Sequence, residues 1–62
     1  MTEYQNLPND PAMLLSFVNT QLRDNYPSFS EFVAAFHADA DAITEKLKMI
    51  HYEYDETQNQ FV

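Results

Sequence analysis

The feature that most constrains this sequence is the absence of cysteine from a chain of only 62 residues. A domain this short buries about 60% of the surface that its unfolded chain exposes, so we expect marginal stability. Without cysteine there is no disulfide to supplement the core, no thiolate ligand for zinc and no redox-active thiol. The sequence therefore predicts one small domain, residues 1–62, that depends on its hydrophobic core.

Acidic residues outnumber basic ones by 10 to 3, which gives a formal net charge of −7. Binding to a nucleic-acid backbone or an anionic membrane requires clustered cations, and the cations here are Arg23, Lys46 and Lys48. The charge therefore disfavours nucleic acids and membrane surfaces as partners. An acidic surface is also the ordinary means by which a small protein stays soluble.

The sequence contains neither a membrane-span pattern nor a secretory-signal pattern. Its longest apolar runs are much shorter than the roughly 18 residues needed to cross a bilayer. No basic segment precedes an apolar one in the order found in signal peptides. We therefore expect no membrane association and a cytoplasmic location.

The first helix is predicted over residues 10–24. Asp10 can cap the free amides, and Pro11 at the first helical position loses no needed donor. Leu14 and Val18 lie one turn apart, as in a helix that buries one face. The preceding residues, 1–9, form a polar lead-in whose apolar anchors are Tyr4 and Leu7.

A boundary follows the first helix, and a second helix is predicted over residues 28–37. Pro27 disfavours a helical conformation in the residue before it, and Asn25 is suited to a left-handed cap. Ser28 and Glu31 have the spacing of a capping box, which marks the start of a helix.

A third helix is predicted over residues 39–50. Either Asp39 or Asp41 can cap its first turn. Apolar side chains then recur at helical spacing, which predicts that they face the core. These are Ile43, Leu47 and Ile50.

The end of the chain, residues 51–62, changes from helical spacing to alternation and predicts a short β-hairpin. Residues 52–54 alternate aromatic and acidic side chains, and residues 59–62 can return as the partner strand. The turn would occupy residues 55–58, with Asn59 in the left-handed conformation that glycine usually adopts. The aromatic pairs expected to hold the hairpin on the helices are Tyr52 or Tyr54 with Phe61.

The spacing of residues 28–47 resembles a helix-turn-helix, although such turns usually carry glycine where this chain has His37. The predicted fold is thus mainly α: a three-helix, helix-turn-helix-like bundle with a short C-terminal β-hairpin, like a miniature winged helix. Fold alone implies no function. The outward side of the third helix would present Asp41, Thr44, Glu45 and Lys48. Its two carboxylates against one ammonium would repel nucleic-acid phosphates.

Ordered motifs cover most of the chain, up to both of its ends. They are Asn9-Asp10-Pro11, Met13-Leu14-Leu15-Ser16, Val18-Asn19, Leu22-Arg23-Asp24, Tyr52-Glu53-Tyr54-Asp55 and Asn59-Gln60-Phe61. In length and order they resemble a family of short bacterial proteins known as domain of unknown function 4250. The chain departs from that family at His51, where the family pattern commonly has glycine. The resemblance implies a bacterial cytoplasmic protein and brings no activity.

One string of possible metal ligands, His37, Asp39 and Asp41, lies between the second and third helices. A structural zinc site needs four ligands, mostly cysteine and histidine, which the chain lacks. A calcium loop starting at Asp39 would need glycine and glutamate where Thr44 and Ile50 stand. We interpret the string as a polar turn with a helix cap, and we expect no metal and no cofactor.

Catalysis is also not indicated. The serines and histidines lie outside any recognisable nucleophile elbow or triad pattern, and Ser28 already has a capping role. A chain of this length also rarely encloses a cavity of roughly 300 Å³. We therefore predict a protein that is not an enzyme.

Aromatic and polar residues outside the predicted helical core suggest a surface for a protein partner. Tyrosine and arginine are favoured at interfaces, and Asn19 and Arg23 lie one turn apart on the first helix. Alternatively, these two residues lie on the solvent face of the helix or hold the tail of the chain by hydrogen bonds. The carboxyl partner of Arg23 could then be Asp24 or an acidic residue of the hairpin. The candidate surface comprises Tyr4, Asn19, Arg23, Tyr26, Tyr52, Tyr54 and Phe61.

These observations predict a small non-enzymatic protein–protein interaction module, with a homodimer as one way to cover the candidate surface. The alternative is a helix-turn-helix or winged-helix protein that binds nucleic acid through its third helix and hairpin. A third reading, an acidic decoy for another protein's DNA-binding groove, explains the charge no better than solubility does.

Overall fold

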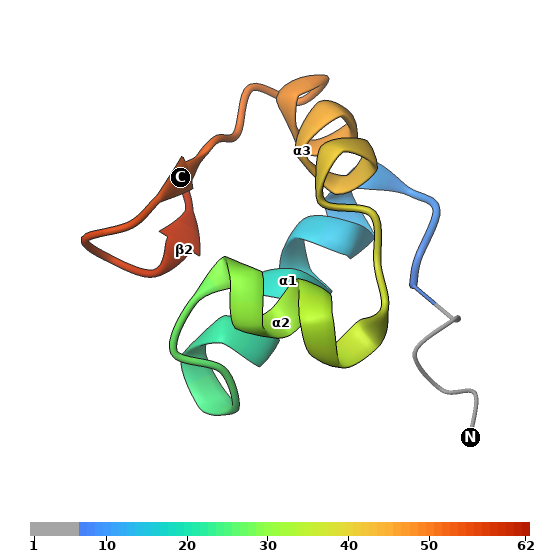
Figure 1. The fold of residues 1–62 in the computed structure, drawn as a ribbon. Helices are drawn as coiled ribbons and strands as arrows, with labels where there is room; N and C mark the ends of the chain where they lie inside the picture. Colours follow the sequence, from blue (N-terminus) through green and yellow to red (C-terminus); the bar gives the residue numbers. More distant parts are fainter. Residues whose placement is uncertain (1–6) are drawn as a thin grey trace.

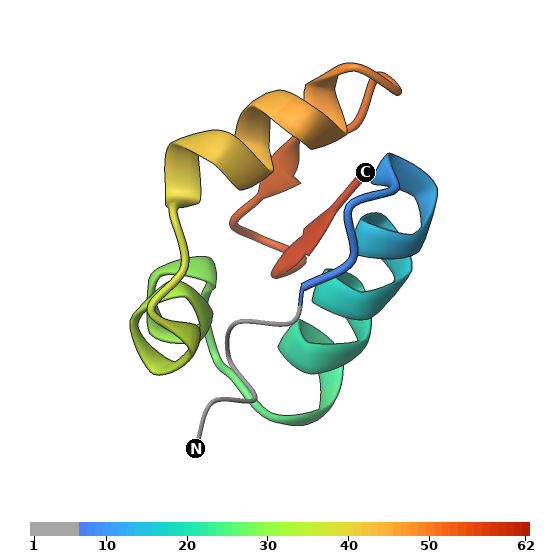
Figure 2. The same ribbon diagram turned by 90° about the vertical axis from the view of Figure 1, so that its right-hand side faces the viewer.

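The first helix, α1 (Pro11–Asp24), is the element on which the other parts of the chain pack (Figures 1 and 2). The computed structural model describes residues 7–62, so the predicted anchor Tyr4 lies outside the described residues. After α1 come α2 (Phe29–Phe36), α3 (Ala40–Lys48), β1 (Tyr54–Asp55) and β2 (Gln60–Phe61). Both other helices and β2 contact α1. The predicted mainly α fold with a C-terminal β-hairpin is confirmed.

Each helix begins at a side chain that accepts a hydrogen bond from a free backbone amide. Asp10 accepts from the N–H of Met13 at 3.1 Å, and Ser28 from the N–H of Glu31 at 3.2 Å. Asp39 accepts from the N–H three residues later at 3.2 Å, so it, and not Asp41, caps α3. Such caps contribute about 1 kcal/mol each, which matters in a fold of marginal stability.

Two histidines occupy left-handed positions at the ends of helices. His37 has φ 53° and His51 has φ 67°, conformations that glycine adopts most readily. In both places the next residue, Ala38 or Tyr52, donates its N–H to a carbonyl five residues earlier, at 3.0 Å. This is the Schellman arrangement, which satisfies the last free carbonyls of a helix. The chain contains no glycine, so histidine takes this role twice.

Two details of the helix ends differ from the sequence prediction, besides the cap residues that the predicted ranges included. Asn25 has φ −128° and is therefore not the left-handed cap that its residue type suggested. The helix predicted to residue 50 ends at Lys48, because the left-handed turn at His51 and its hydrogen bonds already redirect the chain.

The core lies where α1 meets the other elements. Phe32 is fully buried, and its ring lies edge-on to those of Phe17 and Tyr26 at centroid distances of 6.3 and 5.8 Å. Burying one such side chain stabilises the fold by about 1.5–3 kcal/mol. Ile50, predicted to face inward, is half-buried and packs against this core. The buried residues are Leu14, Val18, Leu22, Phe32, Ile43, Leu47 and Phe61.

The hairpin pairs Tyr54 with Phe61 and Asp55 with Gln60 in antiparallel register. Its turn spans residues 56–59, one residue later than predicted, and Asn59 adopts the predicted left-handed conformation with φ 53°. Of the two tyrosines proposed to face Phe61 it is Tyr54 that does so, with ring centroids 5.4 Å apart. A two-stranded hairpin is marginal by itself, so its contacts with the helices decide whether it forms.

Candidate interaction site

The outer edge of β2 is closed by a side chain of α1. Glu53 and Val62 exchange backbone hydrogen bonds of 3.0 and 2.8 Å, so the adjacent pair, Tyr54 and Phe61, directs its peptide groups away from the partner strand. Asn19 donates its Nδ2 to the carbonyl of Phe61 at 3.1 Å and accepts from the Phe61 N–H at 2.8 Å. The side-chain amide thus occupies the position of a third strand.

A second asparagine fastens the turn of the hairpin to the helices. Asn59 donates its Nδ2 to the carbonyls of Leu22 and Tyr26, at 3.1 and 2.9 Å. Its Oδ1 accepts from the hydroxyl of Tyr54 at 2.7 Å, and the same hydroxyl accepts from the N–H of Phe29 at 3.2 Å. These contacts connect the hairpin to the end of α1 and the start of α2.

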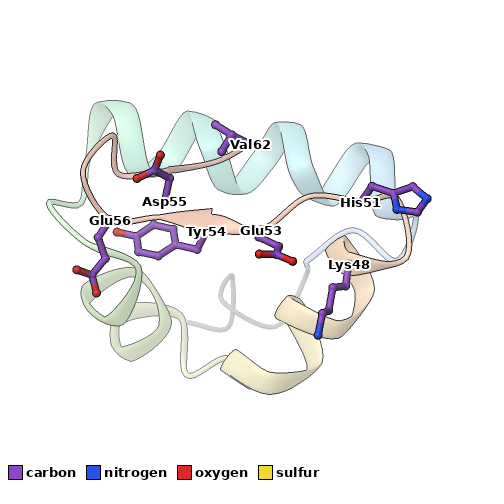
Figure 3. A pocket seen from close by; sticks show the side chains of 7 residues that line it. All are labelled: Lys48, His51, Glu53, Tyr54, Asp55, Glu56 and Val62. Carbon is purple, nitrogen blue, oxygen red and sulfur yellow. The ribbon is translucent and has the colours of Figure 1, made fainter.

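The outer edge of β1, in contrast, is open. Within residues 7–62 neither the N–H nor the C=O of Tyr54 has a hydrogen-bond partner. A hollow of about 630 Å³ adjoins this strand (Figure 3), and its lining is Lys48, His51, Glu53, Tyr54, Asp55, Glu56 and Val62. A second hollow of about 390 Å³ begins at the first turn of α2 and shares two of these residues, Tyr54 and Glu56. Together they form the β1 groove, which runs from the end of α3 to the start of α2.

The β1 groove is predominantly acidic. In Figure 3, Glu53, Glu56 and Lys48 lie on the side of β1 that faces away from β2. The carboxylate of Asp55 is occupied within the turn, where it accepts from the N–H and the hydroxyl of Thr57 at 2.9 and 2.6 Å. Hydrogen bonds from Thr57 and then Gln58 lower the pKa of Asp55. Glu53 and Glu56 are exposed and form no ion pair within the described part of the chain.

The structure separates the predicted partner-surface residues into two groups. Asn19 and Tyr54 hold the hairpin, and Phe61 is only 1% exposed, so its ring belongs to the core and not to an outer surface. Tyr26 is half-buried against the Phe32 ring. For Asn19, the alternative reading, hydrogen bonds that hold the tail, is confirmed.

Arg23 and Tyr52 remain at the surface. The guanidinium of Arg23 forms hydrogen bonds of 2.8 and 3.0 Å to the carboxylate of Asp24. This contact raises the pKa of Arg23 and lowers the pKa of Asp24. Both groups are exposed, so the pair adds little to stability. Tyr4 belongs to the part of the chain outside the described residues.

Sequence reasoning missed two exposed apolar side chains beside the hairpin. Met49 is 71% exposed and Val62 48% exposed, and Tyr52 between them in the chain is 36% exposed. Val62 pairs with Glu53, the neighbour of Tyr52, so the ladder brings it to the segment that follows α3. We refer to Met49, Tyr52 and Val62 as the apolar end. The signal for Val62 was its alternation with the buried Phe61, which directs it outward.

The described residues 7–62 contain no group of three or more His, Cys, Asp or Glu side chains that could hold a metal ion. The string of His37, Asp39 and Asp41 instead contains a helix end and the cap of α3. None of the helices over this range is both long enough and apolar enough to cross a bilayer.

The model of a known family covers nearly all of this fold. The model of a family described as a domain of unknown function, DUF4250, matches residues 8–61. The chain belongs to the DUF4250 family. The match begins just before the cap of α1 and ends in β2, so it includes every helix and strand described above. Comparison with curated proteins and with solved structures gives no match.

Proposed function

We propose that this DUF4250 protein is a non-enzymatic interaction module that binds another protein through the apolar end. The observation that carries the proposal is the exposure of Met49, Tyr52 and Val62 in a chain whose other large apolar side chains, Met13 excepted, are buried or half-buried over residues 7–62. Large apolar side chains exposed on neighbouring segments are a common feature of contact sites, and these three lie at the end of α3 and at the paired end of the hairpin that follows it. The setting that we propose is the bacterial cytoplasm, in line with the cysteine-free sequence.

The surroundings of the titratable groups support a role without catalysis. Over residues 7–62 no polar or charged residue is buried, and the groups with shifted pKa values are Arg23, Asp24 and Asp55. Their shifts come mainly from hydrogen bonds at exposed positions, which keep carboxylates charged. A carboxyl group that acts as a general acid or base near neutral pH needs the opposite environment, one that raises its pKa toward 7.

The alternative, nucleic-acid binding through α3, has the order of the elements in its favour and the charge against it. α3 exposes Asp41 and Glu45 beside Lys48, and the hairpin adds the exposed Glu53 and Glu56. Carboxylates at these positions would repel phosphates. We therefore expect no binding to a mixed-sequence DNA duplex in fluorescence anisotropy, even at low salt.

Quantitative affinity capture from the parent organism tests the proposed function. The tagged wild-type chain is compared with a triple variant, M49S/Y52S/V62S, and with Met13→Ser as the matched control, since Met13 is 63% exposed but lies on α1. We expect a bound protein, or a second copy of the chain, that Met13→Ser retains and the triple variant loses. Circular dichroism is used to check that both variants fold. Capture that is equal for all three chains would contradict the proposal.

A further inference from the structure

We infer that the β1 groove binds an extended basic segment of the partner protein, which adds to the hairpin as a strand beside β1. The inference rests on the proposed function and names the chemistry of its partner. Its basis is the open edge at Tyr54 together with the shape and charge of the groove.

The closed edge of the same hairpin indicates what the open edge accepts. At β2 the peptide group of Phe61 is paired with the amide of Asn19, which supplies one donor and one acceptor in a plane. A peptide group of a second chain presents the same donor and acceptor. The N–H and C=O of Tyr54 face away from β2 in the same manner and have no partner within residues 7–62. Strand addition would complete this pairing.

The groove has the form required for an extended segment. Its two hollows, about 630 and 390 Å³, meet at Tyr54 and Glu56. They therefore follow β1 past both of its ends, from Lys48 at the end of α3 to Ser28 at the start of α2. An extended chain advances about 3.3 Å per residue, so a few residues suffice to follow such an edge.

Charge selects a basic segment and disfavours a second copy of this chain. The groove holds three carboxylates, those of Glu53, Asp55 and Glu56, against the single ammonium of Lys48. If β1 paired with the β1 of another copy, Glu53 and Glu56 of one chain would lie near Glu53 and Glu56 of the other. Like charges on paired strands are destabilising. Lysine or arginine in the added strand would instead find two carboxylates that have no ion-pair partner among the described residues.

The probe for this inference is an acetylated and amidated hexapeptide of alternating lysine and valine, titrated into ¹⁵N-labelled full-length protein. We expect saturable binding with the largest amide shifts at Tyr54 and Glu56 and small shifts at Phe61, whose N–H is already bonded. E53Q/E56Q should weaken binding about tenfold, as expected for the loss of two charge contacts. D41N/E45Q on α3 is the matched control and should change it less than about twofold.

Two further peptides separate strand addition from plain charge attraction. A peptide N-methylated at every amide cannot donate to the edge by either of its sides, and a peptide with glutamate for lysine has the wrong charge. We expect both to lose binding. Equal binding of the N-methylated peptide, or of the glutamate peptide, would overturn the inference, as would saturation without shifts at Tyr54.

The outcome is distinguishable from failure of the proposed function. If the lysine–valine peptide does not bind but capture still depends on Met49, Tyr52 and Val62, the strand addition is wrong and the interaction module stands. If sedimentation velocity shows a dimer that E53Q/E56Q strengthens, the edge pairs with a second copy, which also overturns the inference.

Discussion

The two edges of this small hairpin differ in their hydrogen bonding. At β2, the Phe61 peptide group is paired with Asn19 and its ring is buried, so this edge belongs to the interior. At β1, the Tyr54 peptide group is unpaired within residues 7–62, beside an acidic groove. A strand pair this short is not stable alone, so one edge must be fixed to the helices. The difference indicates that the closed edge builds the fold and leaves the peptide group of the other edge unpaired.

The largest effect is expected from Asn19→Leu, which removes the closure of β2. The N–H and C=O of Phe61 would then face an apolar side chain without partners, and an unsatisfied buried group costs about 1–3 kcal/mol. We expect the free energy of unfolding, measured by urea denaturation, to fall by about 2–4 kcal/mol. Asn25→Ala is the matched control, because Asn25 is exposed and bonds only Gln21 through its side chain. Similar losses for the two variants would show that Asn19 does not hold the edge.

A smaller effect is expected from Tyr54→Phe, which keeps the ring in the core but removes its hydroxyl. That hydroxyl donates to Asn59 and accepts from the Phe29 N–H. Their loss should lower the free energy of unfolding by about 1–2 kcal/mol. Tyr52→Phe, at a more exposed tyrosine, should change it by less than about 0.5 kcal/mol. If thermal or urea unfolding ranks the two variants the other way, the attachment of the hairpin is misassigned.

His51→Gly is expected to stabilise the protein, since His51 directs the chain from α3 to β1 with φ 67°. Glycine adopts this conformation without the steric penalty of roughly 1–2 kcal/mol that other residues incur. It also raises the conformational entropy of the unfolded chain, which offsets part of that gain. The net gain should be about 0.5–1 kcal/mol in the free energy of unfolding. His51→Ala, which retains a Cβ, should give no gain. A gain of equal size with alanine would show that the side chain, and not the backbone, is responsible.

The smallest effect on the free energy of unfolding is expected from Asp55→Asn, in the turn that joins the two strands. Hydrogen bonds from Thr57 and Gln58 lower the pKa of Asp55 in the folded protein. A lowered folded pKa means that the ionised carboxylate stabilises the fold above its unfolded pKa, near 3.9, and that this contribution is lost as the pH falls through the folded value. The difference in unfolding free energy between wild type and Asp55→Asn should therefore shrink in acid. Thr57→Ala should return the pKa of Asp55 toward its ordinary value in an NMR titration, and a difference that stays constant with pH would contradict this assignment.

Much of the fold was predictable because its signals are local. Asp10, Ser28 and Asp39 each cap a helix a few residues away, and Asn59 adopts its turn conformation by virtue of its own residue type. Asn25 was assigned wrongly for the same reason: its type permits a left-handed cap, but the hydrogen bonds at the end of α1 form without one.

The open edge was not predictable in the same way. Which peptide groups face outward depends on the register, and the sequence allowed either Tyr52 or Tyr54 to face Phe61. Only the pairing of Glu53 with Val62 decides that Tyr54 and Phe61 direct their peptide groups outward. The role of Asn19 likewise depends on a partner 42 residues away in the chain.

Amide hydrogen exchange of the free protein, resolved residue by residue by NMR, tests the difference between the two edges most directly. The Phe61 N–H is bonded to Asn19 and should exchange only on global unfolding, whereas the Tyr54 N–H has no partner within residues 7–62 and should exchange much faster. Strong protection of Tyr54 would mean that the β1 edge is already covered, and rapid exchange at Phe61 would mean that the β2 edge is not closed. Either result would contradict the assignment of one closed and one open edge.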